Sequence, residues 1–528
     1  MPTGSKQDKY DAVVIGGGHN GLVAAVYLAK SGLSVLVLER LDEPGGATQS
    51  VEAFTGLPAR ISRYSYLVSL FPDRIIDELG LDMEFRSRRT ASYTPVIRNG
   101  QYTGLMVERN EGELTRQSFR DVTGSDREYD AWRSFYSEVG DFAKEVAPTL
   151  MEPLAYSNEI YDRVKRETWE MLVENPIGRA IEERFHDDTV RGVIATDAVI
   201  GTFSGLHDES LLQNKSFLYH LIGNGTGEWR VPVGGTGAVT GALERAAWRH
   251  KVEIVNRAFV NKVESDGKTA AVSWQSAGET HTVECDWVLG NVAPWVLQIL
   301  LGEHPGPRPE GSQIKVNMLL ERLPRLRSGA SPAQAFAGTF HVNEGYDQLQ
   351  RAYDEASAGN VPSQPPGELY CHTLTDPSVL GPLAIDGKHA FTYFGLHTPA
   401  RLFAGNVDQV RDEAVGRALD AINMHLEEPI ESLLALDANG VPCLEAKAPQ
   451  DIESALAMPG GHIYHGDLAW PWAQPRSLMD TPAHRWGVQT VVPNVVICGA
   501  GAQRGGGVSG IGGHNAAMAV LDSIAGRL

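Results

Sequence analysis

The feature that most constrains this chain is a glycine pattern near its N-terminus, set between a short apolar run and an alanine-rich segment. Asp11 to Ile15 is rich in valine and too short for a helix, so it predicts a buried parallel strand. Gly16, Gly18 and Gly21 follow in the spacing G-x-G-x-x-G. The next segment, Leu22 to Lys30, has alanine and leucine at helical spacing and ends at a Ser-Gly pair. This strand–glycine–helix order predicts a Rossmann-like α/β unit.

Each glycine of the pattern has a physical role in holding a pyrophosphate. Gly16 allows a tight turn, Gly18 lets phosphate approach the backbone, and Gly21 lets the helix lie close to the sheet. The helix N-terminus offers unpaired N–H groups and a partial positive charge. Glu39 follows a second predicted strand, Ser34 to Leu38, at the distance where a carboxylate accepts hydrogen bonds from a ribose hydroxyl. The segment therefore predicts a dinucleotide site, and the acid disfavours a 2′-phosphate.

The C-terminal segment repeats this order of strand, glycines and helix. Val495 to Cys498 is a predicted strand, 499–507 is rich in glycine, and 513–524 is a predicted helix. A helix N-terminus there would stabilise the negative charge of a reduced flavin, which favours a flavin over a nicotinamide. FAD is therefore the predicted cofactor. Its predicted contacts are Gly16, Gly18, Gly21, Glu39, Arg40, Gly45, Gly46, Ala47, Val260, Gly499, Gly506, Gly507 and Val508.

A third glycine block, 234–241, lacks the spacing of a nucleotide site. Three residues separate Gly237 from Gly241, and the preceding strand, Val231 to Val233, is very short. No second nucleotide fingerprint is predicted, so NAD(P)H is not expected to be a direct partner. Electrons are expected to leave to oxygen or a quinone-like acceptor, or to return to the substrate in an isomerisation.

A change of character after residue 75 predicts an inserted helical region. Ser125 to Glu128 has the pattern of a capping box, which indicates a helix start. The apolar residues of this helix share one face and are Tyr129, Trp132, Tyr136, Val139, Phe142 and Val146. Residues 158–195 are also mostly helical in character. The sequence therefore predicts a helical cap over the cofactor domain.

A second insertion has the pattern of a mixed sheet, which commonly carries a substrate cavity. Its predicted elements are strands at 314–320, 370–374 and 390–396 and a helix at 407–426. A chain of 528 residues suggests two or more domains. The predicted fold class is α/β, with a discontinuous Rossmann-like FAD-binding domain and a mixed-sheet substrate domain with a helical cap. The predicted FAD-binding segments are 1–75, 225–300 and 455–528, and the predicted substrate-domain segments are 76–224 and 301–454.

Charge and cysteine usage exclude several classes of protein. The formal net charge of −20 argues against nucleic acid as a partner and against simple attraction to anionic lipid. The cysteines are widely separated, without C-x-x-C, which argues against a disulfide framework or a cysteine zinc site. The polar N-terminus and the absence of a run of about 18 apolar residues predict a cytoplasmic protein. Peripheral membrane contact and dimer formation stay open.

Together the blocks resemble the phytoene desaturase and carotenoid oxidoreductase superfamily, and within it the branch of pyridine nucleotide-disulfide oxidoreductase domain-containing protein 2. The matching stretches include DAVVIGGGHNGLVAAVYLAKSGLSVLVLER, VPVGGTGAVTGAL, CDWVLGNVAP, IKVNMLLERLP, GGHIYHGD and CGAGAQRGGGVSGIGGHNAA. Pro44-Gly45-Gly46 also resembles flavoproteins of the glutathione-reductase and amine-oxidase type. The resemblance implies FAD-dependent redox chemistry or isomerisation of hydrophobic substrates such as polyenes. The chain departs from the superfamily at Tyr64, usually Cys, and at Ala502-Gln503-Arg504, usually Thr-His-Pro.

Three side chains are candidates for catalysis. Lys315 lies in a predicted strand, and in related amine oxidases a lysine on a comparable strand reaches the flavin N5 through water. His465 with Asp467 would form a general acid–base pair, and Arg504 would contact the flavin or a polar substrate group. Each also has a purely structural interpretation. The histidines show no metal-ligand spacing.

The predicted function is that of an FAD-dependent oxidoreductase, in which a hydrophobic, polyene- or isoprenoid-like substrate transfers a hydride to flavin N5. Hydride removal by a flavin needs proximity and orientation more than an acid–base residue. Two alternatives stay open. The first is an FAD-dependent amine oxidase, and the second is a non-catalytic flavoprotein that serves as a binding partner.

Overall fold

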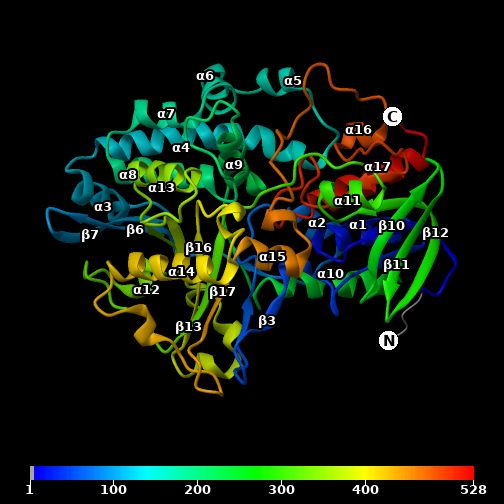
Figure 1. Cartoon of the computed structure of the whole chain (residues 1–528). Coiled ribbons are helices and arrows are strands. Elements are labelled where there is room, and N and C mark those ends of the chain that lie inside the picture. The colour runs from blue at the N-terminus through cyan, green and yellow to red at the C-terminus, as the bar shows by residue number, and fades with distance from the viewer. Residues whose placement is uncertain (1–4, 528) are drawn as a thin grey trace.

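A computed structural model describes residues 5–527, and two seven-stranded sheets organise it (Figure 1). The first sheet has the order β10-β11-β12-β1-β2-β9, and β18 pairs with the end of β12. Pairing is parallel from β12 through β9 and antiparallel across β10, β11 and β12. Its strands are β1 (Lys9–Ile15), β2 (Val35–Leu38), β9 (Glu253–Val255), β10 (Phe259–Ser265), β11 (Ala270–Ser276), β12 (Glu279–Gly290) and β18 (Val495–Ile497). Strands far apart in sequence therefore form one sheet.

Three helices pack together beside this sheet. They are α1 (His19–Lys30), α10 (Gly237–Arg249) and α17 (Ile511–Ile524), and α1 contacts both of the others. Residues 19–28 of α1 are all buried, which fits a helix whose sequence is apolar on nearly every side. The helix predicted from Leu22 begins earlier, at His19, because the glycine loop ends at Gly18, the N-cap.

The second sheet has the order β17-β13-β16-β15-β14-β6-β7. Its strands are β6 (Thr90–Arg98), β7 (Gln101–Glu108), β13 (Ile314–Leu320), β14 (Thr339–Val342), β15 (Gly367–Tyr370), β16 (His389–Gly395) and β17 (Leu444–Lys447). The bounds of the strand predicted at 370–374 are wrong, because β15 ends at Tyr370 and His372–Leu374 forms a 3₁₀ turn. The β6–β7 hairpin lies inside the segment predicted as a helical cap, yet it belongs to the second sheet, which it joins through β14.

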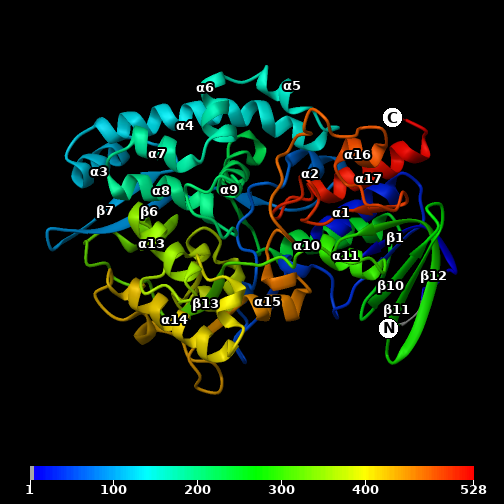
Figure 2. The same cartoon turned by 45° about the horizontal axis from the view of Figure 1, so that its top comes forward.

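Helices cover one side of the molecule above the second sheet (Figure 2). They are α3 (Glu113–Thr123), α4 (Arg127–Val146), α7 (Ile177–Arg184), α8 (Asp188–Val199) and α9 (Leu212–Leu221). The predicted capping box is wrong: Asp126 is the N-cap of α4, and no side chain caps this end. The Glu128 carboxylate instead accepts hydrogen bonds from the amides of His186 and Asp187, so a tertiary contact replaces the local one.

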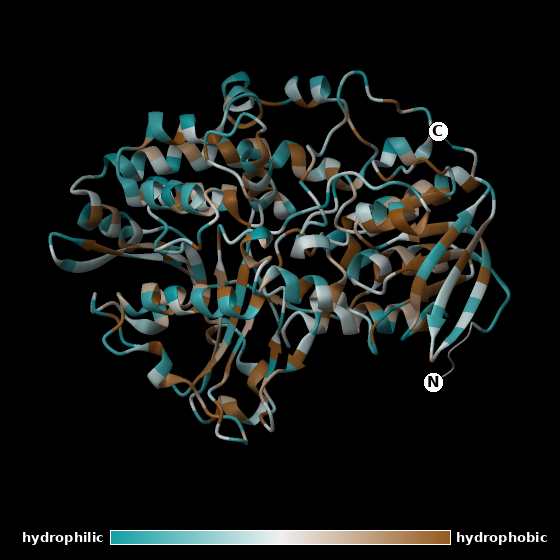
Figure 3. Ribbon diagram, viewed as in Figure 1, coloured by the Kyte–Doolittle hydropathy of each residue, from teal (hydrophilic) through white to brown (hydrophobic). Residues whose placement is uncertain are grey.

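Further helices and two small ribbons connect these parts of the structure. The remaining helices are α2 (Asp73–Leu79), α5 (Ser157–Tyr161), α6 (Arg166–Trp169), α11 (Pro294–Leu300), α12 (Pro332–Ala335), α13 (Tyr346–Ser357), α14 (Val407–Asn423), α15 (Pro449–Leu456) and α16 (Pro482–Trp486). Two small ribbons pair β3 (Ser50–Glu52) with β4 (Arg60–Ser62) and β5 (Phe85–Arg86) with β8 (Val231–Pro232). Hydrophobic residues concentrate in the interior strands and helices (Figure 3). Within residues 5–527, no helix has the length and apolar character needed to span a bilayer.

Candidate functional site

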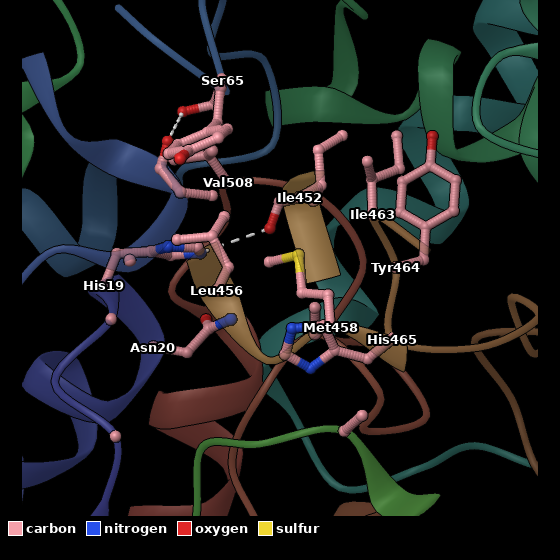
Figure 4. Close-up of a pocket in the computed structure, with 18 of the residues that line it drawn as sticks. His19, Asn20, Ser65, Ile452, Leu456, Met458, Ile463, Tyr464, His465 and Val508 are labelled. Carbon is pink, nitrogen blue, oxygen red and sulfur yellow. Dashed lines mark hydrogen bonds between the residues drawn. The ribbon is translucent and has the colours of Figure 1, made fainter. Parts of the chain in front are cut away.

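A cavity of about 300 Å³ is lined by residues of both sheets and of the segments between them. This volume is at the lower end of the range of small-molecule sites. Figure 4 shows His19 and Asn20 of α1 facing the same space as Val508 and the 463–465 segment. The cavity therefore lies where the N-terminal glycine loop, the C-terminal glycine loop and the second sheet meet.

The first glycine loop lies against Asn291 at the end of β12. Gly16 has a φ of +96°, and a Cβ there would stand 2.8 Å from the Asn291 carbonyl oxygen, so only glycine fits this turn. The Asn291 side-chain amide donates a hydrogen bond to the Gly16 carbonyl at 3.0 Å. Gly18 lines the cavity as the N-cap of α1, and because it has no side chain it caps none of the first-turn amides. The first-turn amides of α1 are thus available to an anion.

Glu39 is positioned at the end of β2 by two backbone amides. Its Oε2 accepts a hydrogen bond from the Gly17 amide at 2.7 Å, and its Oε1 accepts one from the Leu41 amide at 2.7 Å. The residue is buried, yet it lines the cavity. A carboxylate has about four acceptor positions, so two bonds leave capacity for the hydroxyls of a ribose.

The C-terminal glycine loop joins the first at His19. The His19 Nε2 lies 3.3 Å from the Gly507 carbonyl oxygen, and burial lowers the pKa of His19 to about 4. His19 is therefore neutral at pH 7 and links α1 to the loop before α17. Gly507 and Gly510 both have positive φ, and Gly510 is the N-cap of α17. The loop that leads into α17 therefore lies at the cavity, beside the N-terminus of α1.

The predicted cofactor contacts separate into two groups. Those that line the cavity are Gly16, Gly18, Glu39, Arg40, Gly46, Ala47, Val260, Gly507 and Val508. The others are Gly21, Gly45, Gly499 and Gly506, which do not line it. A Cβ would collide with a neighbouring residue at Gly21, Gly45 and Gly506, and would be in tight contact at Gly499. At Gly21, for example, a Cβ would stand 2.3 Å from the Gly16 carbonyl oxygen. These glycines shape the loops without facing the cavity.

The N-terminus of α10, in the middle glycine block, already has its amides bonded. The Thr236 amide donates to Ser62 Oγ at 3.0 Å, and the Gly237 amide donates to Ser50 Oγ at 2.9 Å. The Gly234 amide donates to the Asp376 carboxylate at 2.7 Å. These glycines thus hold the loop against the β3–β4 ribbon, which accounts for a glycine block without nucleotide spacing.

Lys315 of β13 lines the cavity, but its ammonium group is held by backbone. Its Nζ donates to the carbonyls of Ser62 and Tyr64 at 2.8 and 2.7 Å. The Nζ also lies 4.9 Å from the centroid of the Tyr66 ring. Burial holds the pKa of Lys315 well below its usual value. The amine is therefore fixed in orientation at the cavity wall.

His465 and Asp467 do not form the predicted pair. His465 lines the cavity, its Nδ1 has no hydrogen-bond partner, and burial lowers its pKa to about 4. Asp467 instead lies 3.8 Å from His462 Nε2, and its side chain is 68% exposed. The left-handed backbone at His465, with a φ of +65°, turns the two side chains to different neighbours. His465 remains a cavity residue without a carboxylate partner.

Arg504 is placed away from the cavity. Its guanidinium donates to the carbonyls of Thr149, Glu152 and Trp486, and it is 1% exposed. Burial lowers its pKa to about 10, so it stays charged at pH 7. The proposed contact with a flavin or substrate is therefore not formed, because Arg504 ties the C-terminal loop to the helical cap.

Several cavity residues carried no interpretable sequence signal. The apolar wall from α15 onward consists of Ile452, Leu456, Met458, Ile463 and Tyr464. A polar group on the other side consists of Arg88, Asp197, His220, Glu368 and Tyr370. Asn291 could have been found, since it follows a predicted strand in a Gly-Asn-Val-Ala-Pro stretch. The others come from separate segments that only tertiary folding brings together.

Comparison with known proteins finds a match to the N-terminal segment and a likeness in overall fold. The family model of the NAD(P)-binding Rossmann-like domain matches residues 14–74. A solved structure of a putrescine oxidase variant has a TM-score of 0.58, 17% identity, and coverage of 98% of this chain and 99% of that chain. This likeness shows a shared fold.

Two sequence relatives cover almost the whole chain. A protein of Mycobacterium tuberculosis described as uncharacterized is 46% identical over 527 residues, 98% of each chain. The mouse pyridine nucleotide-disulfide oxidoreductase domain-containing protein 2 is 29% identical over 575 residues, which covers 98% of this chain and 94% of that protein. The chain belongs to the same family as the mycobacterial protein and is a homologue of pyridine nucleotide-disulfide oxidoreductase domain-containing protein 2.

Proposed function

We propose that this protein is an FAD-dependent oxidoreductase that acts on a hydrophobic, polyene- or isoprenoid-like substrate. The observation that carries the proposal is the contact between His19 and Gly507, which brings two glycine–helix units to one cavity beside Glu39. One unit suits a pyrophosphate and the other suits the anionic edge of a reduced flavin.

The residues present fit FAD. The cradle at Gly18 would be filled by a Cβ, which would stand 3.0 Å from Asn291 Nδ2, and the first-turn amides of α1 would meet the pyrophosphate. Glu39 would accept hydrogen bonds from the ribose. When bound, FAD supplies a hydride acceptor. The chain's own contribution is to orient the substrate and exclude water through the apolar wall at Ile452, Leu456 and Ile463.

An amine oxidase is the second candidate. Its support is Lys315, whose Nζ is fixed at the cavity wall and whose pKa is lowered by burial. The hydrogen bonds to the carbonyls of Ser62 and Tyr64 keep this amine on the side of the cavity formed by β13. The sequence resemblance favours the hydrophobic substrate, and the fold is common to both activities.

Anaerobic mixing with substrate panels tests the proposal. Purified protein should be yellow, and acid precipitation should leave the flavin in the supernatant because no covalent link is expected. Polyenes or isoprenoids should bleach the flavin, or be isomerised without net bleaching as followed by chromatography. Bleaching by amines alone would favour the second candidate. A protein that takes up no FAD would refute both, and a flavoprotein inert to every class would favour a binding role.

NADH and NADPH should not bleach the flavin rapidly at low concentration. The supporting observation is that the amides of Thr236 and Gly237 are bonded to serine hydroxyls rather than open to a phosphate. Reoxidation in air with formation of peroxide would identify oxygen as the acceptor. Rapid bleaching by either nicotinamide would overturn this part of the proposal.

A further inference from the structure

Three buried side chains of the second sheet meet beside the cavity. His341 of β14 and Glu368 of β15 are directly opposite each other in the antiparallel ladder, so their side chains share one face. Glu344 follows the end of β14. One ligand atom from each residue lies within 4.8 Å of the other two. All three residues are at most 4% exposed, and Glu368 lines the cavity.

Glu344 has an unsatisfied carboxyl group in this cluster. Neither of its oxygens has a hydrogen-bond partner among the described residues, although the residue is 1% exposed. The neighbouring Thr196 hydroxyl of α8 lowers the pKa of Glu344 and so opposes the effect of burial, but it does not reach normal hydrogen-bond geometry. Gly192 of α8 packs so closely on this segment that a Cβ would stand 1.9 Å from the Glu344 carbonyl oxygen. A buried carboxylate without a partner is costly, so the geometry calls for a proton or a cation.

The histidine is oriented as a ligand. His341 Nδ1 is 2.7 Å from Thr94 Oγ1, and its Nε2 lies 3.8 Å from Glu344 Oε2. A hydrogen bond on one imidazole nitrogen fixes the ring so that the other nitrogen can bind a metal. On Glu368, Oε2 accepts a hydrogen bond from the Tyr370 hydroxyl at 2.5 Å, which positions this carboxylate in the same way.

The nearby cation, Arg88, forms no ion pair with the cluster. Arg88 faces Glu368, but it donates to the Trp229 carbonyl at 3.3 Å and to Thr339 Oγ1 at 3.1 Å. Within residues 5–527, no ion pair within 4 Å joins Arg88 to a carboxylate. Asp197, a further carboxyl group, also lies near Glu344, and desolvation raises the pKa of Asp197 to about 8.

We propose that His341, Glu344 and Glu368 bind one divalent transition-metal ion at the wall of the cavity. One imidazole and two carboxylates suit Zn²⁺ or Mn²⁺ better than Ca²⁺ or Mg²⁺, which prefer all-oxygen sites. Metal–ligand bonds of about 2.0–2.2 Å require only a modest contraction of the present cluster. A metal ion can reach the cluster from the cavity, because Glu368 lines the cavity wall. The spacing that sequence reasoning passed over is His341-x-x-Glu344, completed by a residue on the next strand.

Metal content per chain tests this site independently of flavin chemistry. The full-length protein, purified without a metal-affinity tag, is dialysed against metal-free buffer and titrated with Zn²⁺ or Mn²⁺. Glu344→Gln and Glu368→Gln remove ligands while keeping shape. Glu182→Gln is the matched control, because Glu182 contacts His207 Nε2 at 3.0 Å and accepts a hydrogen bond from the Tyr346 hydroxyl, but belongs to no part of the cluster.

Wild type and Glu182→Gln should retain one metal ion per chain, and each cluster variant should bind at least about tenfold more weakly. Flavin content and thermal melting, measured on the same samples, show whether each variant is folded. Anomalous diffraction from zinc-soaked wild-type crystals should give one peak among the three side chains. Equal metal retention by wild type and Glu344→Gln would overturn the proposal. If that variant does not fold, a map without the peak would overturn it, and would show that the carboxyls hold protons instead.

Discussion

Gly513 of α17 lies in direct contact with Asn20 of α1: a Cβ at Gly513 would stand 2.0 Å from the Asn20 carbonyl oxygen. This contact lets the N-terminal parts of the two helices lie side by side, so that the glycine loops that precede them both line the cavity. A glycine within a helix is otherwise unfavourable, so its presence here is explained by the close approach of the two backbones.

Gly513→Ala should therefore separate α1 from α17. Because a backbone carbonyl and not a flexible side chain meets the new methyl, we expect a loss of at least about 1–3 kcal/mol in the free energy of unfolding. FAD retention should fall with it. Gly416→Ala is the control, since Gly416 is an exposed helical position of α14 with open space around it. That change should be neutral or slightly stabilising in urea unfolding. Equal effects of the two substitutions would contradict the helix-contact argument.

Glu39→Ala should weaken FAD binding. Hydrogen bonds to a charged group contribute about 1.5–3 kcal/mol each, so losing the ribose contact should raise the Kd by roughly tenfold or more. The variant also leaves the amides of Gly17 and Leu41 without their acceptor. Fluorescence titration of the apoprotein measures the Kd. Glu43→Ala, an exposed carboxylate of the same loop, should not change it. Unchanged binding by Glu39→Ala would mean that another group holds the ribose.

The free energy of unfolding should fall in mild acid, because histidines buried in the folded protein resist protonation while the same histidines in the unfolded chain bind protons. Burial lowers the pKa of His514 to about 4, and the charges of Arg74 and Arg504 act in the same direction. A hydrogen bond to Asn515 and the charge of Glu78 oppose this shift. A folded pKa below the unfolded value means that this stability is present above about pH 6.5 and is lost toward pH 4.

At pH 5 the expected loss from His514 is about 2 kcal/mol relative to pH 7.5. His514→Gln should remove this part of the pH dependence. Urea unfolding at both pH values gives the change in the free energy of unfolding with pH for wild type and for the variant. Comparing these two changes cancels any effect of the substitution that does not depend on pH. A stability gap that does not change with pH would refute the assignment.

Arg504→Met should reduce stability without changing flavin chemistry. The three carbonyls of Thr149, Glu152 and Trp486 would lose their donor, at about 1–3 kcal/mol for each buried group left unpaired. Thermal melting should show the loss, while the flavin spectrum and the kcat per folded flavoprotein stay unchanged. Arg476→Met, at an exposed position, should lie within about 0.5 kcal/mol of wild type. A large fall in kcat with unchanged melting would restore a catalytic role for Arg504.

The sequence alone determined the local units. The strand at 11–15, the turn at Gly16 and the carboxylate of Glu39 were predictable because each depends on a few adjacent residues and one repeating pattern. The same is true of β13, whose predicted bounds agree with the structure. Patterns failed where a distant group competed, as when Glu128 accepts the amides of His186 and Asp187 instead of capping its own helix.

Only the tertiary structure decided which side chains face the cavity. In the sequence, His465, Asp467 and Arg504 are all polar residues near glycines and cannot be told apart. In the structure, His465 lines the cavity, Asp467 pairs with His462, and Arg504 is buried and bonded to backbone carbonyls. The cluster of His341, Glu344 and Glu368 likewise exists only because β14 and β15 pair in one register. Side-chain direction depends on pairing and packing between segments far apart in the chain, and a linear pattern does not contain that information.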